Sequence, residues 1–205
     1  MNAPRVAQLS ALADLFEEAL AQSHPESVAI LGIAGGNGLE RVDISVTKRI
    51  VAVDINPTYL NAVRERHPKL PLKPVRVDLT KETVNEEGVQ LVHAALIFEH
   101  TGIDESLRNA ASLVAADGYL SVVLQLPSTE EADVSQTPVQ SIQTLSDHFK
   151  IVDRARLGTA LKMMGFNLCN ERKCDVPAGK AFWLGIFKRS KCSDQPCRSN
   201  SSISS

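Results

Sequence analysis

The 205-residue sequence has few aromatic side chains and no excess of positive charge. Aromatic residues make up 4% of the chain, and 22 Lys and Arg residues stand against 24 Asp and Glu residues. Proteins that bind nucleic acids neutralise phosphates with clustered cations and stack bases on aromatic rings. The composition therefore disfavours nucleic acid as a partner.

Long apolar segments are also missing. The first 22 residues carry Asp14, Glu17 and Glu18 among their apolar residues, so they do not have the pattern of a signal peptide. No later segment has the unbroken apolar length that crosses a bilayer. We therefore expect a cytoplasmic protein that makes no membrane contact. The sequence carries no signal for a particular oligomeric state.

Cysteine is scarce and is not arranged for metal binding. Cys169 and Cys174 lie in a strand-like segment, and Cys192 and Cys197 lie in a polar tail. Neither spacing matches the paired Cys-x-x-Cys of a zinc site. We predict free thiols in a reducing compartment and no metal site.

The composition does allow one good hydrophobic core. Hydrophobic residues make up 43% of the chain, and its length favours a single domain, which we place at residues 1–190. Apolar residues recur at helical spacing over residues 4–22, so the N-terminal segment 1–26 is expected to be mainly one amphipathic helix. Residues 191–205 are polar, and we predict that they are disordered.

The middle of the chain alternates short apolar runs with helical patterns. This alternation is typical of a parallel sheet with helices on both faces. The runs predict strands over residues 27–31, 49–53, 75–79, 89–98 and 119–124. The segments between them predict helices over residues 37–45, 57–66, 80–87 and 103–115.

The last third departs from this alternation. Residues 127–150 are too polar at first for a core and read as an insertion, after which a helix is expected over residues 154–164. Strands over 166–174 and 181–187 are joined by a short connection, which indicates a hairpin. The predicted fold class is therefore α/β: a Rossmann-like, doubly wound, seven-stranded sheet, mostly parallel with an antiparallel strand in its terminal hairpin.

Candidate binding residues follow the strands, because ligands of such sheets bind beyond the carboxyl ends of the strands. Residues 32–38 contain four glycines and an alanine, which let the backbone turn sharply and approach a ligand closely. Asp54 follows the second strand, 22 residues after Gly32, where it can accept hydrogen bonds from ribose hydroxyls. Asp78 follows the third strand and can accept from an adenine amine.

Each of these acids also has a purely structural interpretation. Asp54 precedes Pro57 and Asp78 precedes Thr80, so either residue can be a helix N-cap. Glu99 and His100 follow the fourth strand, and a His there can accept a proton from an attacking hydroxyl or amine. A lone His at a strand end is more often a structural or surface residue.

The glycine spacing separates two kinds of nucleotide site. A dinucleotide site needs Gly-x-Gly-x-x-Gly, which no register of residues 32–38 satisfies. The segment instead resembles motif I of the class I S-adenosylmethionine-dependent methyltransferases, written acid-x-Gly-x-Gly-x-Gly. In this register the acid falls on Gly32 and the first glycine on Ala34. That acid often helps to hold the ammonium group of the methionine.

The resemblance extends over residues 27–187 and includes Val-Asp-Ile-Asn-Pro at 53–57, Val-Asp-Leu-Thr at 77–80 and the final hairpin. There is no Asn-Pro-Pro-Tyr, so methylation of the amino group of a base or a glutamine is not indicated. The resemblance implies a methyltransferase with S-adenosylmethionine as cofactor and Glu99 and His100 as candidate catalytic residues. It implies cofactor contacts from Gly32, Ala34, Gly36, Asn37, Gly38, Asp54, Ile55, Asp78, Leu79 and Phe98.

The acceptor of the methyl group is expected to be a small molecule, selected by the N-terminal helix and the 127–150 insertion, which are expected to cap the site. Two other functions stay open. The protein can be a non-catalytic binding protein with a methyltransferase fold, as the missing acid suggests. It can also be a nucleotide-binding oxidoreductase, which the glycine spacing and the closing hairpin disfavour.

Overall fold

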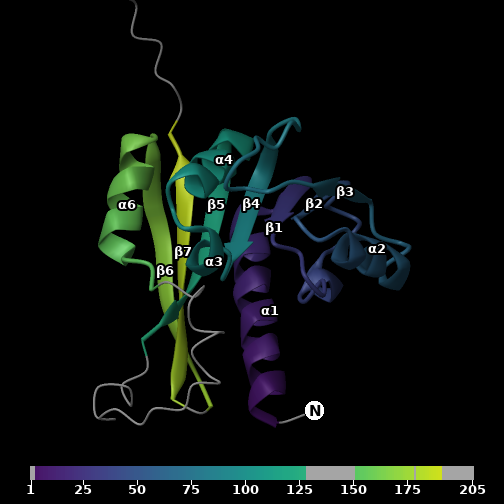
Figure 1. Cartoon of the computed structure of the whole chain (residues 1–205), viewed down its shortest axis with the longest axis horizontal. Helices are drawn as coiled ribbons and strands as arrows, with labels where there is room; N and C mark the ends of the chain where they lie inside the picture. Colours follow the sequence, from purple (N-terminus) through teal and green to yellow (C-terminus); the bar gives the residue numbers. More distant parts are fainter. Residues whose placement is uncertain (1–2, 128–150, 178, 191–205) are drawn as a thin grey trace, which may run out of the picture.

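Alternating apolar strands and helices build one seven-stranded sheet with helices on both faces (Figure 1). The computed structural model describes residues 3–127, 151–177 and 179–190. The strands are β1 (Ser27–Leu31), β2 (Arg49–Asp54), β3 (Leu72–Arg76), β4 (Val89–Ala95), β5 (Val114–Leu126), β6 (Phe166–Val176) and β7 (Lys180–Arg189). The helices are α1 (Ala3–Ser23), α2 (Pro57–Arg66), α3 (Phe98–Thr101), α4 (Glu105–Leu113) and α6 (Arg154–Met163), with a 3-10 turn η1 at Leu39–Arg41.

The sheet order is β3-β2-β1-β4-β5-β7-β6. The strands from β1 to β5 pair in parallel, whereas β7 runs antiparallel to both β5 and β6. The winding direction reverses at β1, whose two neighbours are β2 and β4. The predicted fold class is therefore confirmed. In sheets of this kind, ligands bind beyond the carboxyl ends of the strands at such a reversal, which here lies between β1 and β4.

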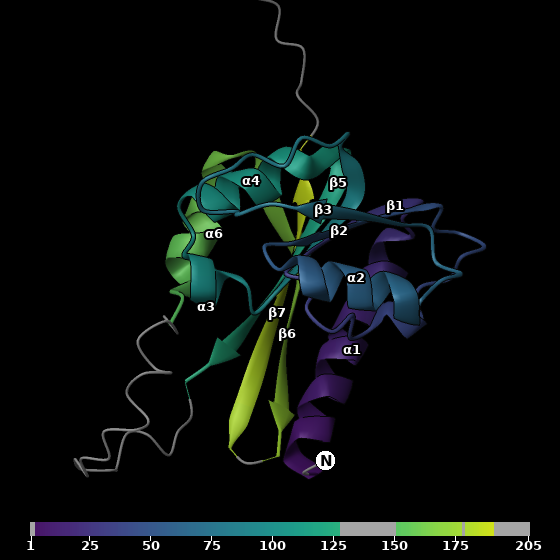
Figure 2. The ribbon, with the colours of Figure 1, turned by 45° about the vertical axis from the view of Figure 1, so that its right-hand side comes forward.

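Helices lie on both faces of the sheet (Figure 2), and one hydrophobic cluster packs on each face. Alternate residues of β1 belong to opposite clusters, as expected when a central strand is buried on both sides. Ala29 packs in the cluster that contains α4 and α6, whereas Val28 packs in the cluster that contains α1 and α2. Helices α1 and α2 therefore share one face of the sheet.

Several predicted boundaries were wrong because edge and connecting segments have weak apolar patterns. The third strand is 72–76 rather than 75–79, since it lies at the edge of the sheet, where Pro74 is tolerated. The apolar Val77 and Leu79 attracted the prediction, but they are buried in the loop after that strand. The predicted helix at 80–87 is absent from this described segment.

Other predicted elements were displaced or shortened. The helix expected at 37–45 is reduced to the 3-10 turn η1. The fourth strand ends at Ala95, and Phe98 begins the short helix α3. The fifth strand starts at Val114, directly after α4, so the predicted helix 103–115 was too long at both ends.

The N-terminal helix was predicted correctly, with α1 ending at Ser23 before Pro25. The predicted disordered tail, 191–205, and all but Pro127 of the predicted insertion, 127–150, lie outside the described residues. Within the described part of the chain, no helix is long and apolar enough to cross a membrane.

Candidate functional site

The glycine loop, defined here as residues 32–38, turns tightly between β1 and η1. Every second residue of this loop has a positive φ: +70° at Gly32, +43° at Ala34, +76° at Gly36 and +87° at Gly38. Side chains disfavour this left-handed region, which explains why small residues occupy these positions. The loop also folds back on β2, because the carbonyl of Val53 accepts the N–H groups of Gly32 (2.8 Å) and Ile33 (3.1 Å).

Asp54 links the glycine loop to the start of α2. It is 9% exposed, and its Oδ2 accepts the N–H of Ala34 at 3.0 Å while Oδ1 accepts the N–H of Asn56 at 2.8 Å. The N-cap of α2 is Asn56, whose side chain accepts the N–H of Thr58. Asp54 is therefore not the helix cap, and its carboxylate holds two backbone segments at the carboxyl edge of the sheet.

Both α1 and α2 press directly on the glycine loop. A Cβ at Gly36 would lie 3.1 Å from the Val63 side chain of α2, and a Cβ at Gly38 would lie 3.0 Å from Phe16 Cδ1 of α1. Larger residues would push these helices away. The two glycines therefore allow close packing of the loop between the helices.

Polar contacts also attach the end of the loop to α1. The Asn37 side chain donates to the carbonyl of Leu9 at 2.9 Å. Arg41 of η1 forms ion pairs of 2.8 Å with both Asp14 and Glu17. The side chain of Asn37 thus contacts the N-terminal helix, and its expected cofactor contact stays a prediction.

The structure favours a second register of the methyltransferase motif. Gly32 has a φ of +70°, and a Cβ there would lie 2.8 Å from Ile97 Cδ1, so an acidic side chain at this position would be strained and would displace Ile97. Moving the motif two residues earlier places its glycine positions on Gly32, Ala34 and Gly36, which have positive φ, as do the glycine positions of the first register. The acid position is then Ile30, a buried residue of β1. The motif acid is absent in either register.

A cavity of about 460 Å³ lies beside the ends of β2 and β3 and is lined by Ile55, Arg76, Asp78, Lys81 and Glu82. Its volume is in the range of small-molecule sites. The structure thus brings together two of the predicted cofactor residues, Ile55 and Asp78.

Asp78 is also part of a tight local turn. Its Oδ1 accepts hydrogen bonds from the N–H (3.0 Å) and the hydroxyl (2.6 Å) of Thr80, and Lys81 lies 3.4 Å from Oδ2. The hydrogen bonds from Thr80 lower the pKa of Asp78, so this carboxylate stays ionised. Asp78 thus stabilises a turn, and its interpretation as a helix N-cap was wrong because no helix follows in this described segment.

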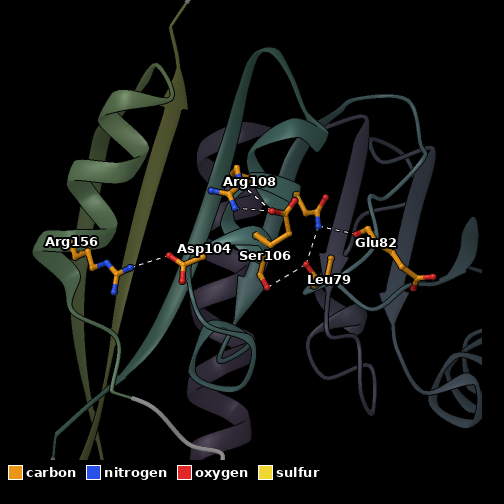
Figure 3. Close-up of polar contacts among 8 residues, drawn as sticks. Leu79, Glu82, Asp104, Ser106, Arg108 and Arg156 are labelled. Atoms are coloured by element: carbon orange, nitrogen blue, oxygen red, sulfur yellow. Dashed lines mark hydrogen bonds and ion pairs between the residues drawn. The ribbon is translucent and has the colours of Figure 1, made fainter.

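Helix α4 holds the loop after β3 in place (Figure 3). The buried side chain of Asn109 donates to the carbonyls of Leu79 (2.9 Å) and Glu82 (2.8 Å), and Ser106 donates to the carbonyl of Leu79 at 3.4 Å. Sequence reasoning missed Asn109. The signal for it was an amide residue on the buried face of an amphipathic helix.

The three residues predicted after the fourth strand have different environments on α3. Phe98 is fully buried in the core, and its expected cofactor contact stays a prediction. Glu99 is 1% exposed; its Oε1 accepts the N–H of Gln125 at 2.8 Å, and its Oε2 has no hydrogen-bond partner among the described residues. Burial raises the pKa of Glu99. His100 is exposed.

A second buried polar pair was also missed. His93 of β4 lies with Nδ1 3.1 Å from the hydroxyl of Ser121 on β5, and its ring centroid is 4.5 Å from that of Phe16. Burial lowers the pKa of His93 to about 3, so the ring is neutral at physiological pH. A histidine inside the apolar run of residues 89–98 was the available signal.

No protein-family model matches the sequence, and no curated protein matches it in sequence. Solved structures do match the fold. Magnesium protoporphyrin IX methyltransferase from Synechocystis PCC 6803, with bound S-adenosylhomocysteine, has a TM-score of 0.71 at 12% identity, covering 93% of this chain and 89% of that one. N-methyltransferase NodS from Bradyrhizobium japonicum WM9, also with S-adenosylhomocysteine, has a TM-score of 0.67 at 14% identity, covering 92% and 88%.

The chain therefore has the fold of the class I S-adenosylmethionine-dependent methyltransferases. A structure described as the 4+2 cyclase SpnF shares this fold, with a TM-score of 0.65 at 12% identity over 88% of this chain and 81% of that one. A protein with this fold can thus carry a different activity, and the function has to be argued from the site.

Proposed function

We propose that this single-domain protein binds S-adenosylmethionine at the carboxyl edge of β1, β2 and β3 and transfers its methyl group to a small-molecule acceptor. The observation that carries the proposal is the buried Asp54 carboxylate, which holds the glycine loop at the reversal point of this sheet order. A dinucleotide site is disfavoured because the loop lacks the spacing that cradles a pyrophosphate.

The adenosine half of the cofactor fits the residues present. Each Asp54 oxygen accepts one backbone N–H and retains a second lone pair that can accept from a ribose hydroxyl. Ile55, 57% exposed, offers an apolar surface to the adenine ring beside the cavity that Asp78 lines. Leu79 follows Asp78 in the same loop, and Asn109 holds its carbonyl.

The methionine half would lie along the glycine loop at the carboxyl end of β1, where small residues let a ligand approach the backbone. The bound cofactor would supply an activated methyl group: in-line attack by an acceptor O, N, S or C atom forms the bond to the methyl carbon, breaks its bond to sulfur and releases S-adenosylhomocysteine. The protein has to orient the acceptor and exclude water. Glu99 and His100 on α3 stand beyond β4 as candidates to take the acceptor's proton.

The missing motif acid and the cyclase with the same fold support a second candidate function. In this case the protein binds the cofactor or a partner without methyl transfer.

Titration calorimetry distinguishes the proposed methyltransferase from an oxidoreductase and from a non-catalytic binding protein. We expect S-adenosylhomocysteine to bind with one-to-one stoichiometry and NADH not to bind. Preferential NADH binding would support an oxidoreductase. Cofactor binding without transfer of tritium from labelled S-adenosylmethionine to any of a broad acceptor panel would favour the non-catalytic role.

A further inference from the structure

The buried carboxylate of Glu99 has a hydrogen-bond donor on only one of its two oxygens among the described residues. Its Oε1 accepts the N–H of Gln125 at 2.8 Å, whereas Oε2 has no donor among the residues that the structure describes. A buried carboxylate oxygen without a donor destabilises the protein, because desolvation is not offset by a hydrogen bond. A ligand that donates a hydrogen bond to Oε2 of Glu99 would remove this penalty.

Glu99 lies at the edge of the sheet where the glycine loop begins. Ile97, two residues before it, packs on Gly32, since a Cβ there would lie 2.8 Å from Ile97 Cδ1. Gln125, to which Glu99 is bonded, is the penultimate residue of β5. The connection that carries Glu99 therefore joins the carboxyl ends of β4 and β5 to the start of the loop.

The other carboxylates at this edge already have donors on both oxygens. Asp54 accepts the N–H groups of Ala34 and Asn56, and Asp78 accepts from Thr80 and pairs with Lys81. Both also stand at β2 and β3, on the side proposed for adenosine. Among the described residues, Glu99 is the buried acid with an open acceptor at the β4 side of the edge.

We propose that Glu99 accepts a charge-assisted hydrogen bond from the α-ammonium group of S-adenosylmethionine, in place of the motif acid that this chain lacks. The inference rests on the proposed function. Ile30 and Gly32, the two positions that the motif acid could take, provide no negative charge. An ammonium group would give Oε2 its missing donor and would pair two opposite charges in a water-poor site, where such bonds are strong.

The protonation state of Glu99 is consistent with this role. Burial raises the pKa of Glu99, because desolvation disfavours the ionised carboxylate. A bound ammonium group would favour the ionised form. Cofactor binding would then be coupled to the loss of a proton from this side chain.

The test compares two ligands that differ at the methionine end. S-adenosylhomocysteine carries the ammonium group, whereas 5′-methylthioadenosine has the same thioadenosine and no amino-acid part. Calorimetry is run on the wild type and on Glu99→Gln, which keeps the shape and an acceptor for Gln125. We expect Glu99→Gln to lose about tenfold or more in affinity for S-adenosylhomocysteine. Its affinity for 5′-methylthioadenosine should change by less than about twofold.

Glu105→Gln is the matched control, because Glu105 is a more exposed acid, paired with Arg108 on α4. It should change neither affinity. If thermal denaturation shows that Glu99→Gln is unfolded, Glu99→Asp is used instead. The aspartate side chain is one methylene shorter, so its carboxylate lies farther from the ammonium group. The same selective loss of affinity for S-adenosylhomocysteine is expected.

Unchanged affinity for S-adenosylhomocysteine would overturn the inference. Equal losses for both ligands would do the same, since they indicate a purely structural role for Glu99. If the wild type binds neither ligand, the proposed function itself fails. The two failures are therefore distinguishable.

Discussion

The Asp54 carboxylate accepts the N–H of Ala34 at 3.0 Å, across the boundary between β2 and the glycine loop. Ala34 has a φ of +43°, a conformation that a residue with a side chain rarely adopts without support. One acid thus stabilises the strained loop and presents its remaining lone pairs at the carboxyl edge of the sheet. Structure and proposed binding depend on the same side chain.

Asp54→Asn is expected to weaken both the stability of the glycine loop and the proposed binding of the cofactor. An amide in place of the carboxylate keeps one acceptor and loses the charge-assisted bonds, so stability should fall by about 1–3 kcal/mol. Affinity for S-adenosylhomocysteine should fall by about tenfold or more. Chemical denaturation and calorimetry measure the two effects. The exposed Asp43 provides the control Asp43→Asn, and an Asp54→Asn variant with full affinity would show that Asp54 only holds the loop.

Asn109→Ala tests whether α4 supports the cavity that Ile55 and Asp78 line, by holding the loop after β3. Removing this side chain leaves the carbonyls of Leu79 and Glu82 without a shared donor, which should cost about 1–3 kcal/mol of stability. The loosened loop should lower affinity for S-adenosylhomocysteine several-fold. Arg108→Ala, on the exposed side of the same helix, should do neither. Wild-type affinity in a measurably destabilised Asn109→Ala variant would remove this residue from the account of the site.

His93 should make the protein sensitive to acid. Its pKa is lowered to about 3 in the folded chain and is near 6.5 when unfolded, so its contribution to stability is complete above pH 6.5. That contribution is lost as the pH falls from 6.5 toward 3, by up to about tenfold in the folding equilibrium per pH unit. His93→Gln, which cannot gain the charge, should flatten this part of the pH–stability curve.

Exposed His24 gives the control for this experiment. Stability is measured by urea denaturation at several pH values between 3 and 7 for the wild type, His93→Gln and His24→Gln. His24→Gln should follow the wild-type curve. A His93→Gln curve as steep as that of the wild type would assign the acid sensitivity to other groups.

Two glycine substitutions should have opposite effects. Gly32→Ala places a Cβ at φ +70° and 2.8 Å from Ile97 Cδ1, so it should destabilise the protein by about 1–3 kcal/mol. Gly158→Ala adds a methyl group inside α6 with no neighbour within 4 Å, which should stabilise by about 0.5–1 kcal/mol. Thermal denaturation compares them, and a neutral Gly32→Ala would show that the loop and Ile97 accommodate a side chain at this position.

The sequence predicted best where patterns are governed by local burial. The strand at 27–31 and the helix starting at Pro57 were correct because one is a short buried run and the other has proline at its first turn. The third strand was displaced because apolar Val77 and Leu79 are buried by a loop rather than by strand pairing. Periodicity does not separate these two ways of burying a residue.

For the site, the sequence located the glycine loop and Asp54 but not what surrounds them. The contacts of Asn109 with Leu79 and of Ile97 with Gly32 span residues far apart in the chain, so spacing does not reveal them. The close contact at Gly32 likewise comes from a distant residue, Ile97, which follows β4. These contacts between residues distant in sequence become visible only in the folded structure.

A crystal structure of the chain with S-adenosylhomocysteine tests the central claim most directly. The account predicts the ribose hydroxyls at Asp54, the adenine beside Ile55 and Asp78, the methionine end along the glycine loop, and the ammonium group at Glu99. Ligand bound elsewhere, such as the cavity of about 740 Å³ lined by α6 and Trp183, would contradict the account. So would crystals that remain free of ligand at saturating concentration.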